Sequence, residues 1–280
     1  MILLKKLVFF SFSICCAAVA FAQPDISVEP AKLNTDDAFA VKPGSWEAEF
    51  GYSLANGKHQ NDYHGSRNHR GKLREHHFDW SLKTGLVDRF ELNAAIGYAN
   101  LLDKETSADG PVRGHGWKDI ELGSKIEVVR GVERNFVFSY APSVMIPSGR
   151  ESREDRLGPG GDSTVIQQRV IFTKIIGRWS FDLDSGYGLP VGNRKGFRGT
   201  GDVNAAAGYQ IFNWLQPGME LNYAHDFINE EYDADTFAMT WGAVMPIHER
   251  IRINSGVQQV LAGKNTDQTT TFSVVTTLFL

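Results

Sequence analysis

Apolar and polar residues alternate with a period of two along most of this chain. Between residues 90 and 98, one face carries Phe90, Leu92, Ala94, Ile96 and Tyr98, and the other carries Glu91, Asn93, Ala95 and Gly97. The stretches 179–187 and 215–223 repeat the pattern. Because successive side chains of a strand point to opposite sides, the pattern predicts β-strands with one apolar and one polar face.

Twelve such segments follow one another along the chain. Each has about 10 to 14 residues, which is the length that a tilted strand needs to cross a bilayer. The segment near 163 alternates poorly, because Gln167, Gln168 and Arg169 interrupt it. The expected starts lie near residues 44, 71, 89, 116, 135, 163, 178, 200, 214, 235, 250 and 268.

The connections between these segments alternate in length. Short turns are expected at 87–88, 131–134, 176–177, 213 and 248–249, and longer polar connections at 57–70, 101–115, 147–162, 191–199, 229–234 and 263–267. Outer-membrane barrels have short turns on the periplasmic side and longer loops outside. The pattern therefore predicts an up-and-down arrangement with the long loops facing the exterior.

Aromatic residues lie near both ends of the apolar faces. Phe90 and Tyr98 are eight residues apart, as are Trp179 and Tyr187. Eight residues at about 3.3 Å each, tilted by about 45°, span roughly 19 Å, close to the height of a lipid-facing band. The alternative is a secreted β-sandwich or a lipocalin-like protein, which would bury these rings inward.

The first 22 residues resemble a secretory leader. Lys5 and Lys6 precede an apolar core at 7–19, and Ala20-Phe21-Ala22 fits a cleavage site before Gln23. Both cysteines, Cys15 and Cys16, lie in this leader, where Ile14 makes the alternative of lipidation a poor match. We expect a cleaved signal peptide at 1–22, a periplasmic lead-in segment at 23–43 and a barrel at 44–280.

Charge and hydropathy narrow the class of protein. Without the two leader lysines the chain has 27 basic and 33 acidic residues, a net charge of 27 − 33 = −6, which argues against nucleic-acid binding. After the leader, no apolar run approaches the roughly 18 residues of a transmembrane helix. A membrane-spanning chain without such helices must form a closed barrel. We therefore expect an all-β, transmembrane, antiparallel up-and-down barrel of about twelve strands in the outer membrane of a Gram-negative-type bacterium.

Several motifs resemble a broad family of outer-membrane proteins that is labelled "putative MetA-pathway of phenol degradation". They are the stretch 35–44 (TDDAFAVKPG) followed by Trp46-Glu47, then 85–92 (GLVDRFEL), 117–125 (WKDIELGSK) and 145–149 (MIPSG). The resemblance covers most of the chain after the leader. It implies a barrel that passes small compounds, often hydrophobic or aromatic, and it supplies no catalytic residues.

The polar face carries the candidate functional residues. If the apolar face meets lipid, ten carboxylates and four cations point into the lumen, which suggests a weak preference for cations. So many charges must be paired or hydrated, because an unpaired buried ion costs several kcal/mol. A narrow hydrated lumen and a closed, salt-bridged interior both remain open. The predicted lumen-lining residues are Glu47, Glu49, Asp79, Lys83, Glu91, Glu121, Lys125, Glu127, Asp182, Asp184, Glu220, Asp226, Arg250 and Arg252.

Other candidate sites favour simpler interpretations. Five histidines at 59, 64, 69, 76 and 77 lie in the first long loop and the strand that follows it, and they match no zinc spacing. A solvated polar loop is therefore expected, without a metal or cofactor. His225 and Asp226 are adjacent on one strand and would face opposite sides, which disfavours a hydrolase. The charged loop 148–162 is expected to be solvated. Alternatively, the loop could bind lipopolysaccharide, bridge to other loops or fold into the lumen.

We expect a channel without catalytic residues that lets small molecules, aromatic or hydrophobic by the family resemblance, cross the outer membrane down their gradients. A closed structural or adhesive barrel is the first alternative, and an outer-membrane hydrolase is the second. The expected partners are outer-membrane lipid and lipopolysaccharide, a small-molecule solute, and the insertion machinery. The last would recognise the C-terminal strand, in which Phe272, Val274, Thr276, Leu278 and Leu280 alternate to the end of the chain.

Overall fold

The structure is a computed structural model that describes residues 33, 35–104, 112–131, 135–149, 151–152, 157–192, 197–228 and 232–280. The predicted signal peptide at 1–22 and most of the lead-in before residue 35 lie outside the described residues. Within the described ranges, no helix is long and apolar enough to cross a membrane.

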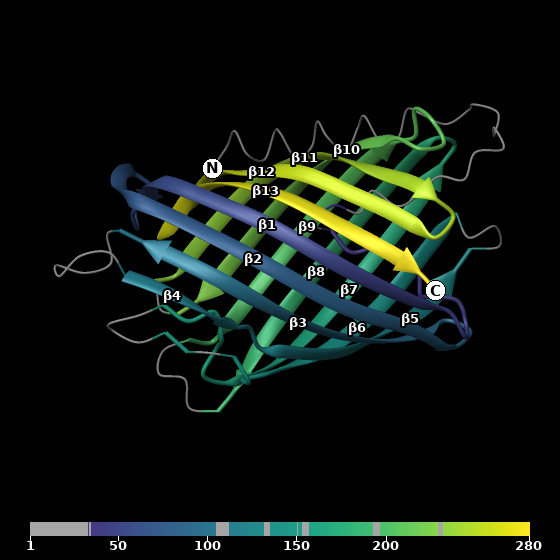
Figure 1. Ribbon diagram of the computed structural model, residues 1–280, viewed down its shortest axis with the longest axis horizontal. Coiled ribbons are helices and arrows are strands. Elements are labelled where there is room, and N and C mark those ends of the chain that lie inside the picture. The colour runs from purple at the N-terminus through teal and green to yellow at the C-terminus, as the bar shows by residue number, and fades with distance from the viewer. Residues whose placement is uncertain are drawn as a thin grey trace.

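In these described ranges, thirteen strands form one antiparallel sheet that closes on itself (Figure 1). Closure comes from β1, which pairs with both β2 and the C-terminal strand β13, and from β2, which also pairs with β3. The strands are β1 (Trp46–Asn61), β2 (Arg67–Val87), β3 (Phe90–Asp103), β4 (Val112–Trp117), β5 (Ile120–Arg130), β6 (Phe136–Ile146), β7 (Thr164–Ile176), β8 (Trp179–Val191), β9 (Gly199–Tyr209), β10 (Gln216–Phe227), β11 (Ala234–His248), β12 (Ile251–Lys264) and β13 (Thr266–Phe279).

Strands β4 and β5 follow each other along the same line and together occupy one strand position in the barrel. Both pair with β3. Residues 98–103, at the long-loop end of β3, pair with β4, and residues 90–95, at its short-turn end, pair with β5. The break between them falls at Lys118 and Asp119. The barrel therefore has twelve strand positions, which confirms the predicted fold.

Three expected long connections are shorter than predicted. Residues 62–66 replace the expected loop 57–70, the loop 101–115 is shortened to 104–111, and residue 265 alone replaces 263–267.

The apolar faces look outward and the acidic faces look inward. Leu183 is 47% exposed on the outer surface of β8, whereas its neighbours Asp182 and Asp184 are 3% and 1% exposed. On β10, Met219 is 42% exposed and Glu220 is fully buried. A closed barrel with an apolar outer belt is a membrane barrel, and such barrels belong to outer membranes.

Aromatic side chains gather at both rims of the outer surface. Trp46 and Trp179 lie beside the short-turn end, and Trp117, Tyr187 and Tyr223 lie toward the long-loop end, all at least 40% exposed. Aromatic girdles at the two membrane interfaces are a feature of transmembrane barrels. The rings therefore mark the borders of the lipid-facing band.

β7 departs from the alternating pattern on both faces, because Gln168 lies on the exposed outward face between Ile166 and Val170. Ile171 is an apolar residue on the inward face, and it is 1% exposed. It forms a buried cluster with Val137 of β6 and Ala38 of the lead-in segment. An apolar patch on the inner wall thus covers a second chain segment, and that segment interrupts the expected polar face.

A charge on the lipid-facing side should destabilise the barrel according to its depth. Leu183 lies midway between the rim residues Trp179 and Tyr187, so we expect Leu183→Arg to lower the free energy of unfolding by about 2–4 kcal/mol. Tyr232→Arg in an extracellular loop is the matched control, with an expected cost of about 0–1 kcal/mol. Urea unfolding in lipid vesicles measures both, and equal costs would contradict the assigned orientation.

Candidate functional site

The described part of the lead-in segment lies inside the barrel, against its inner wall. Its backbone N–H groups donate to carboxylates that belong to several strands. Leu33 N donates to Glu220 Oε1 at 2.8 Å, and Asp36 N donates to Asp184 Oδ2 at 3.0 Å. The segment therefore crosses from β10 past β8, near the short-turn end of the barrel.

The same arrangement continues toward the first strand. Ala40 N donates to Glu127 Oε1 of β5 at 2.8 Å, and Val41 N donates to Glu91 Oε2 of β3 at 2.9 Å. Pro43 then forms a bridge with Gly85, and Gly44 N donates to the carbonyl of Gly85 at 2.9 Å before β1 begins. A Cβ at Gly85 would lie 2.3 Å from two carbonyl oxygens of this segment. Only glycine leaves room for such a close approach.

Apolar and cationic contacts hold the middle of the segment. Ala38 is fully buried, its N–H donates to Thr173 Oγ1 at 2.9 Å, and its carbonyl accepts a hydrogen bond from Ser139 Oγ. Lys125 Nζ donates to the carbonyl of Phe39 at 3.2 Å and lies 3.9 Å from Asp37. The segment and the wall thus satisfy many of each other's polar groups, whereas Thr35 Oγ1 and Glu91 Oε1 are buried without a hydrogen-bond partner among the described residues.

This contact explains how the carboxylates can remain in the interior. Glu91, Glu220 and Asp184 are each at most 1% exposed, and an isolated buried carboxylate would be strongly unfavourable. Hydrogen bonds from backbone N–H groups to an ionised oxygen are charge-assisted and stronger than neutral ones. The segment therefore supplies the donors that these carboxylates would otherwise take from water.

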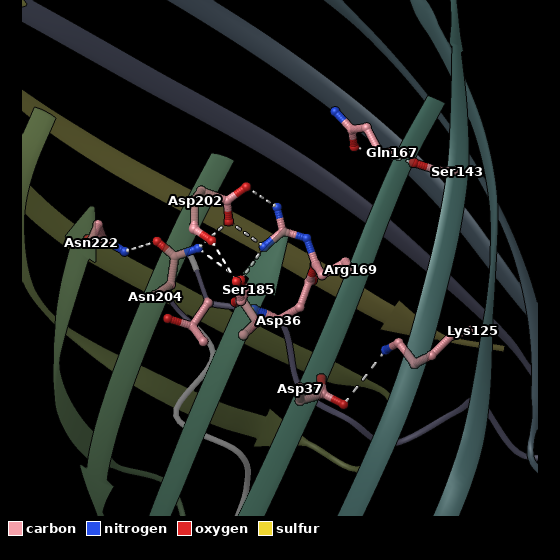
Figure 2. Close-up of polar contacts among 12 residues, drawn as sticks. Asp36, Asp37, Lys125, Ser143, Gln167, Arg169, Ser185, Asp202, Asn204 and Asn222 are labelled. Atoms are coloured by element: carbon pink, nitrogen blue, oxygen red, sulfur yellow. Dashed lines mark hydrogen bonds and ion pairs between the residues drawn. The ribbon is translucent and has the colours of Figure 1, made fainter. Parts of the chain in front are cut away.

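Arg169 is the centre of a second inward-facing network (Figure 2). Its guanidinium contacts Asp184, pairs with Asp202 at 2.8 Å and lies 4.0 Å from Asp36 of the lead-in segment. Asn204 Nδ2 extends the network by donating to Asp184 at 2.9 Å. In the sequence, Arg169 interrupts the alternation of the segment near 163. It is an inward-facing residue that joins the wall to the lead-in segment.

Within the described residues, three cavities mark the free part of the lumen: one of about 210 Å³ beside Gln167, Arg169 and Asp202, and two that Glu121 lines. The larger of these two, of about 460 Å³, lies toward the long loops and has both carboxylates and apolar groups on its surface. Its lining is Glu49, Gly51, Asp79, Trp80, Ser81, Ala95, Ile96, Gly97, Lys118, Asp119, Glu121, Met145, Pro159 and Val275. The smaller, of about 70 Å³, lies beside Asp36, Glu91, Lys125 and Arg169, where the lumen is narrowed by the segment.

Comparison with known proteins identifies the family. The family described as "Putative MetA-pathway of phenol degradation" matches residues 72–274, which is more than half of the chain. The chain belongs to this family. A search of curated proteins finds no match to the sequence.

Solved structures share the fold of this family member. The COG4313 outer membrane channel from Pseudomonas putida F1 superposes with a TM-score of 0.77 at 14% identity, over 89% of this chain and 100% of that one. The translocator domain of the autotransporter NalP from Neisseria meningitidis has a TM-score of 0.51 at 13% identity, over 85% and 89% of the two chains. The KdgM porin in complex with disordered oligogalacturonate has a TM-score of 0.51 at 9% identity, over 83% and 98%. At such identities the likeness concerns the barrel fold.

The predicted lumen-lining residues fall into groups in this family member. Fully or almost fully buried are Glu91, Lys125, Glu127, Asp182, Asp184, Glu220 and Arg252. Cavities are lined by Glu49, Asp79, Lys83 and Glu121, with Lys83 Nζ 2.9 Å from Glu49. Glu47 and Asp226 are half-buried, and Asp226 accepts a hydrogen bond from Thr200. Arg250 is exposed and lies in the turn before β12. That these residues line a conducting path stays a prediction.

The break between β4 and β5 contributes two residues that the sequence reasoning missed. Lys118 Nζ lies 2.7 Å from Asp79 inside the lumen. Asp119 accepts hydrogen bonds from the backbone N–H groups of Gly149 and Gly161, at 2.8 and 2.7 Å. The described ends of the loop 148–162 are thus held by Asp119, and the loop's Pro159 lines the larger cavity. Its charged residues Arg150 and 153–156 lie outside the described residues.

The histidine candidates show no metal site within the described residues, where no group of three or more His, Cys, Asp or Glu side chains could hold an ion. His59 and His69 contact each other edge to face, with ring centroids 5.4 Å apart. His225 Nδ1 lies 2.7 Å from Asp235, whereas the adjacent Asp226 contacts Thr200. The two neighbours therefore have separate partners, as expected for opposite faces of a strand.

Neutralising the carboxylates that hold the lead-in segment should loosen it. We expect Glu91→Gln, Asp184→Asn and Glu220→Gln together to speed the nanosecond motion of a spin label at Ala40→Cys, because the charge-assisted hydrogen bonds are lost. Electron paramagnetic resonance measures the change, and the expected mature chain has no other cysteine. The control Asp79→Asn, Glu121→Gln and Asp226→Asn removes three carboxylates that make no bond to residues 33 and 35–43, the described part of the segment. Equal loosening in both variants would contradict the proposed contact.

Proposed function

We propose that this protein is a passive channel for small solutes whose lumen is narrowed by the lead-in segment. The observation that supports this most directly is the cavity of about 460 Å³ above the segment, inside a closed barrel. Cavities of about 300–1,000 Å³ are typical of small-molecule sites. The segment is held by hydrogen bonds to side chains rather than as a strand of the wall, so it can move without opening the barrel.

The lining of the cavity suits a small aromatic molecule that carries a polar group. Met145, Pro159 and Val275 present apolar surface, while Glu49 and Glu121 present hydrogen-bond acceptors. A hydroxyl group on an aromatic ring would match both kinds of surface. The family description, which refers to phenol degradation, agrees with this class of solute.

The charges in the cavity favour cations. Lys83 pairs with Glu49 and Lys118 pairs with Asp79, so these carboxylates are largely compensated. The Glu121 carboxylate lines the two cavities of about 460 and 70 Å³, and no partner for it is found among the described residues. We infer that Glu121 contributes most to the preference for cations.

A closed barrel is the second candidate, because Ala38, Val137 and Ile171 bury the segment against the wall. In that case the cavity would be a by-product of the fold, and no solute would pass. On either account the protein acts without catalysis and lies in outer-membrane lipid. We further propose that the insertion machinery recognises β13, which completes the barrel by pairing with β1.

Single-channel recording in planar bilayers separates the two candidates. We expect a measurable current from the native barrel, and a severalfold larger conductance after Glu91→Gln, Asp184→Asn and Glu220→Gln release the segment. Phenol should interrupt the current of the native barrel more than glucose does, because glucose lacks the apolar ring surface. Silence of both proteins, with normal heat-modifiable mobility on gels, would establish the closed barrel.

Ion selectivity tests the assignment of Glu121. We expect Glu121→Gln to lower the permeability ratio of cations over anions by up to about fivefold, since a unit charge at about 4 Å in water contributes about 1 kcal/mol. Reversal potentials in a salt gradient measure the ratio. Asp226→Asn is the control, because its carboxylate bonds to Thr200 and lines none of the three cavities. An unchanged reversal potential for Glu121→Gln would refute the assignment.

A further inference from the structure

The extracellular end of the β1–β2 hairpin is basic, although the chain as a whole is acidic. Between residues 56 and 74 the only acidic residue is Asp62, and the basic residues are Lys58, Arg67, Arg70, Lys72 and Arg74. Asp62 is occupied in the turn, where it accepts hydrogen bonds from the N–H groups of Ser66 and His64, both at 2.9 Å. The bond from Ser66 is the largest of the effects that lower the pKa of this carboxyl.

Three of these cations line one groove. It has a volume of about 510 Å³, and none of its lining residues is acidic. The lining is Asn56, Gly57, Lys58, His59, Arg67, Lys72, Gln259, Val260, Leu261, Gln268, Thr269 and Thr270. The amide groups of the asparagine and glutamines and the hydroxyl groups of the threonines in this lining add neutral hydrogen-bond donors.

The cations of the groove have no carboxylate partners among the described residues, and this sets them apart from Arg70. Arg70 is buried and pairs with Asp103 and Asp267. No ion pair is found for Lys58, Arg67 or Lys72 in the described ranges. Three unpaired cations around one hollow repel each other, and an anion bound between them would remove the repulsion.

The groove opens on the outer wall of the barrel. Asn56, Thr270 and Gln259 are register partners across β1, β13 and β12. They lie two residues beyond the lipid-facing positions Phe272 and Val257, which are 45% and 40% exposed, so they share the outward face. The groove therefore lies just beyond the apolar belt, on the side of the long loops.

A β-bulge shapes this site. The register of β1 shifts between Gly57 and His59 against both neighbouring strands. Lys58 is the extra residue against β13, whereas against β2 the extra residues lie on β2, where 70–72 stand opposite Lys58 alone. A bulge bends the strand and redirects side chains. Leu261, which is 43% exposed, lies in the same groove and adds apolar surface next to the cations.

We propose that this groove binds a phosphate group of lipopolysaccharide, with Lys58, Arg67 and Lys72 as its ligands. Lipopolysaccharide is the phosphorylated lipid of the outer leaflet, and its phosphates lie at the level where the apolar belt ends. Lysine and arginine bind phosphate through charge-assisted hydrogen bonds, and clusters of them recognise lipid headgroups. Leu261 and Phe272 then contact the acyl chains. This site is on the outer wall, so the inference does not depend on the proposed function of the lumen.

Native mass spectrometry with diphosphorylated lipid A tests the proposal. We expect a one-to-one adduct with the native barrel, and at least about tenfold weaker binding after Lys58→Gln, Arg67→Gln and Lys72→Gln, because charge-assisted hydrogen bonds are lost. The matched control is Lys104→Gln, Arg113→Gln and Arg198→Gln, three exposed cations outside the groove. Heat-modifiable mobility verifies that both variants fold.

Further probes separate the phosphate of lipopolysaccharide from other anions. Dephosphorylated lipid A should bind weakly, and phosphatidylglycerol and inorganic phosphate should not displace diphosphorylated lipid A at equal concentration. Displacement by phosphatidylglycerol would reveal a general site for anionic lipids, and displacement by inorganic phosphate a site for free anions; either overturns the proposal. Native-like binding by the groove variant, or equal loss in the control, overturns it as well.

Discussion

Every backbone polar group within hydrocarbon must be paired inside the protein, and the rest of this structure depends on that constraint. The chain meets it by pairing β1 with β13, so that the sheet has no free edge. Once the sheet is closed, each strand has one face toward lipid and one toward the interior. The apolar residues lie on the face toward lipid, and the polar residues lie on the face toward the interior.

The inward carboxylates of neighbouring strands lie close together in a confined space. Their charges must therefore be compensated. Part of the solution is ordinary ion pairing, as between Lys83 and Glu49. The other part is the lead-in segment, whose backbone N–H groups donate to Glu91, Glu127, Asp184 and Glu220. The acidic interior and the segment therefore stabilise each other, and the free lumen is what remains between the segment and the long loops.

The inner and outer surfaces use charge differently. Inside, the carboxylates are in excess and most are bonded to the segment or to cations. Outside, Lys58, Arg67 and Lys72 at the end of the β1–β2 hairpin have no carboxylate partner within the part of the chain that the structure describes. The barrel wall thus separates an acidic interior from a basic outer rim. The interior suits cationic or neutral solutes, and the outer rim suits phosphate groups.

The sequence by itself determined the number of strand positions and, for most strands, which face meets lipid, but it placed the strand ends on either side of 62–66 wrongly. These properties are local, since a period of two needs only neighbouring residues to be read. It did not show the break at Lys118 and Asp119, and it led Arg169 to be read as an interruption. Nor did it show what the lead-in segment does.

Only the tertiary structure decided those points, for a physical reason. Ile171 breaks the alternation because Ala38, more than 130 residues earlier, packs against it, and Arg169 is satisfied by aspartates on two other strands. The segment has no period of its own, because its hydrogen bonds go to side chains of several strands rather than to one neighbour. Such contacts join residues on different strands or join the segment to a strand, so no pattern within a short stretch of sequence encodes them.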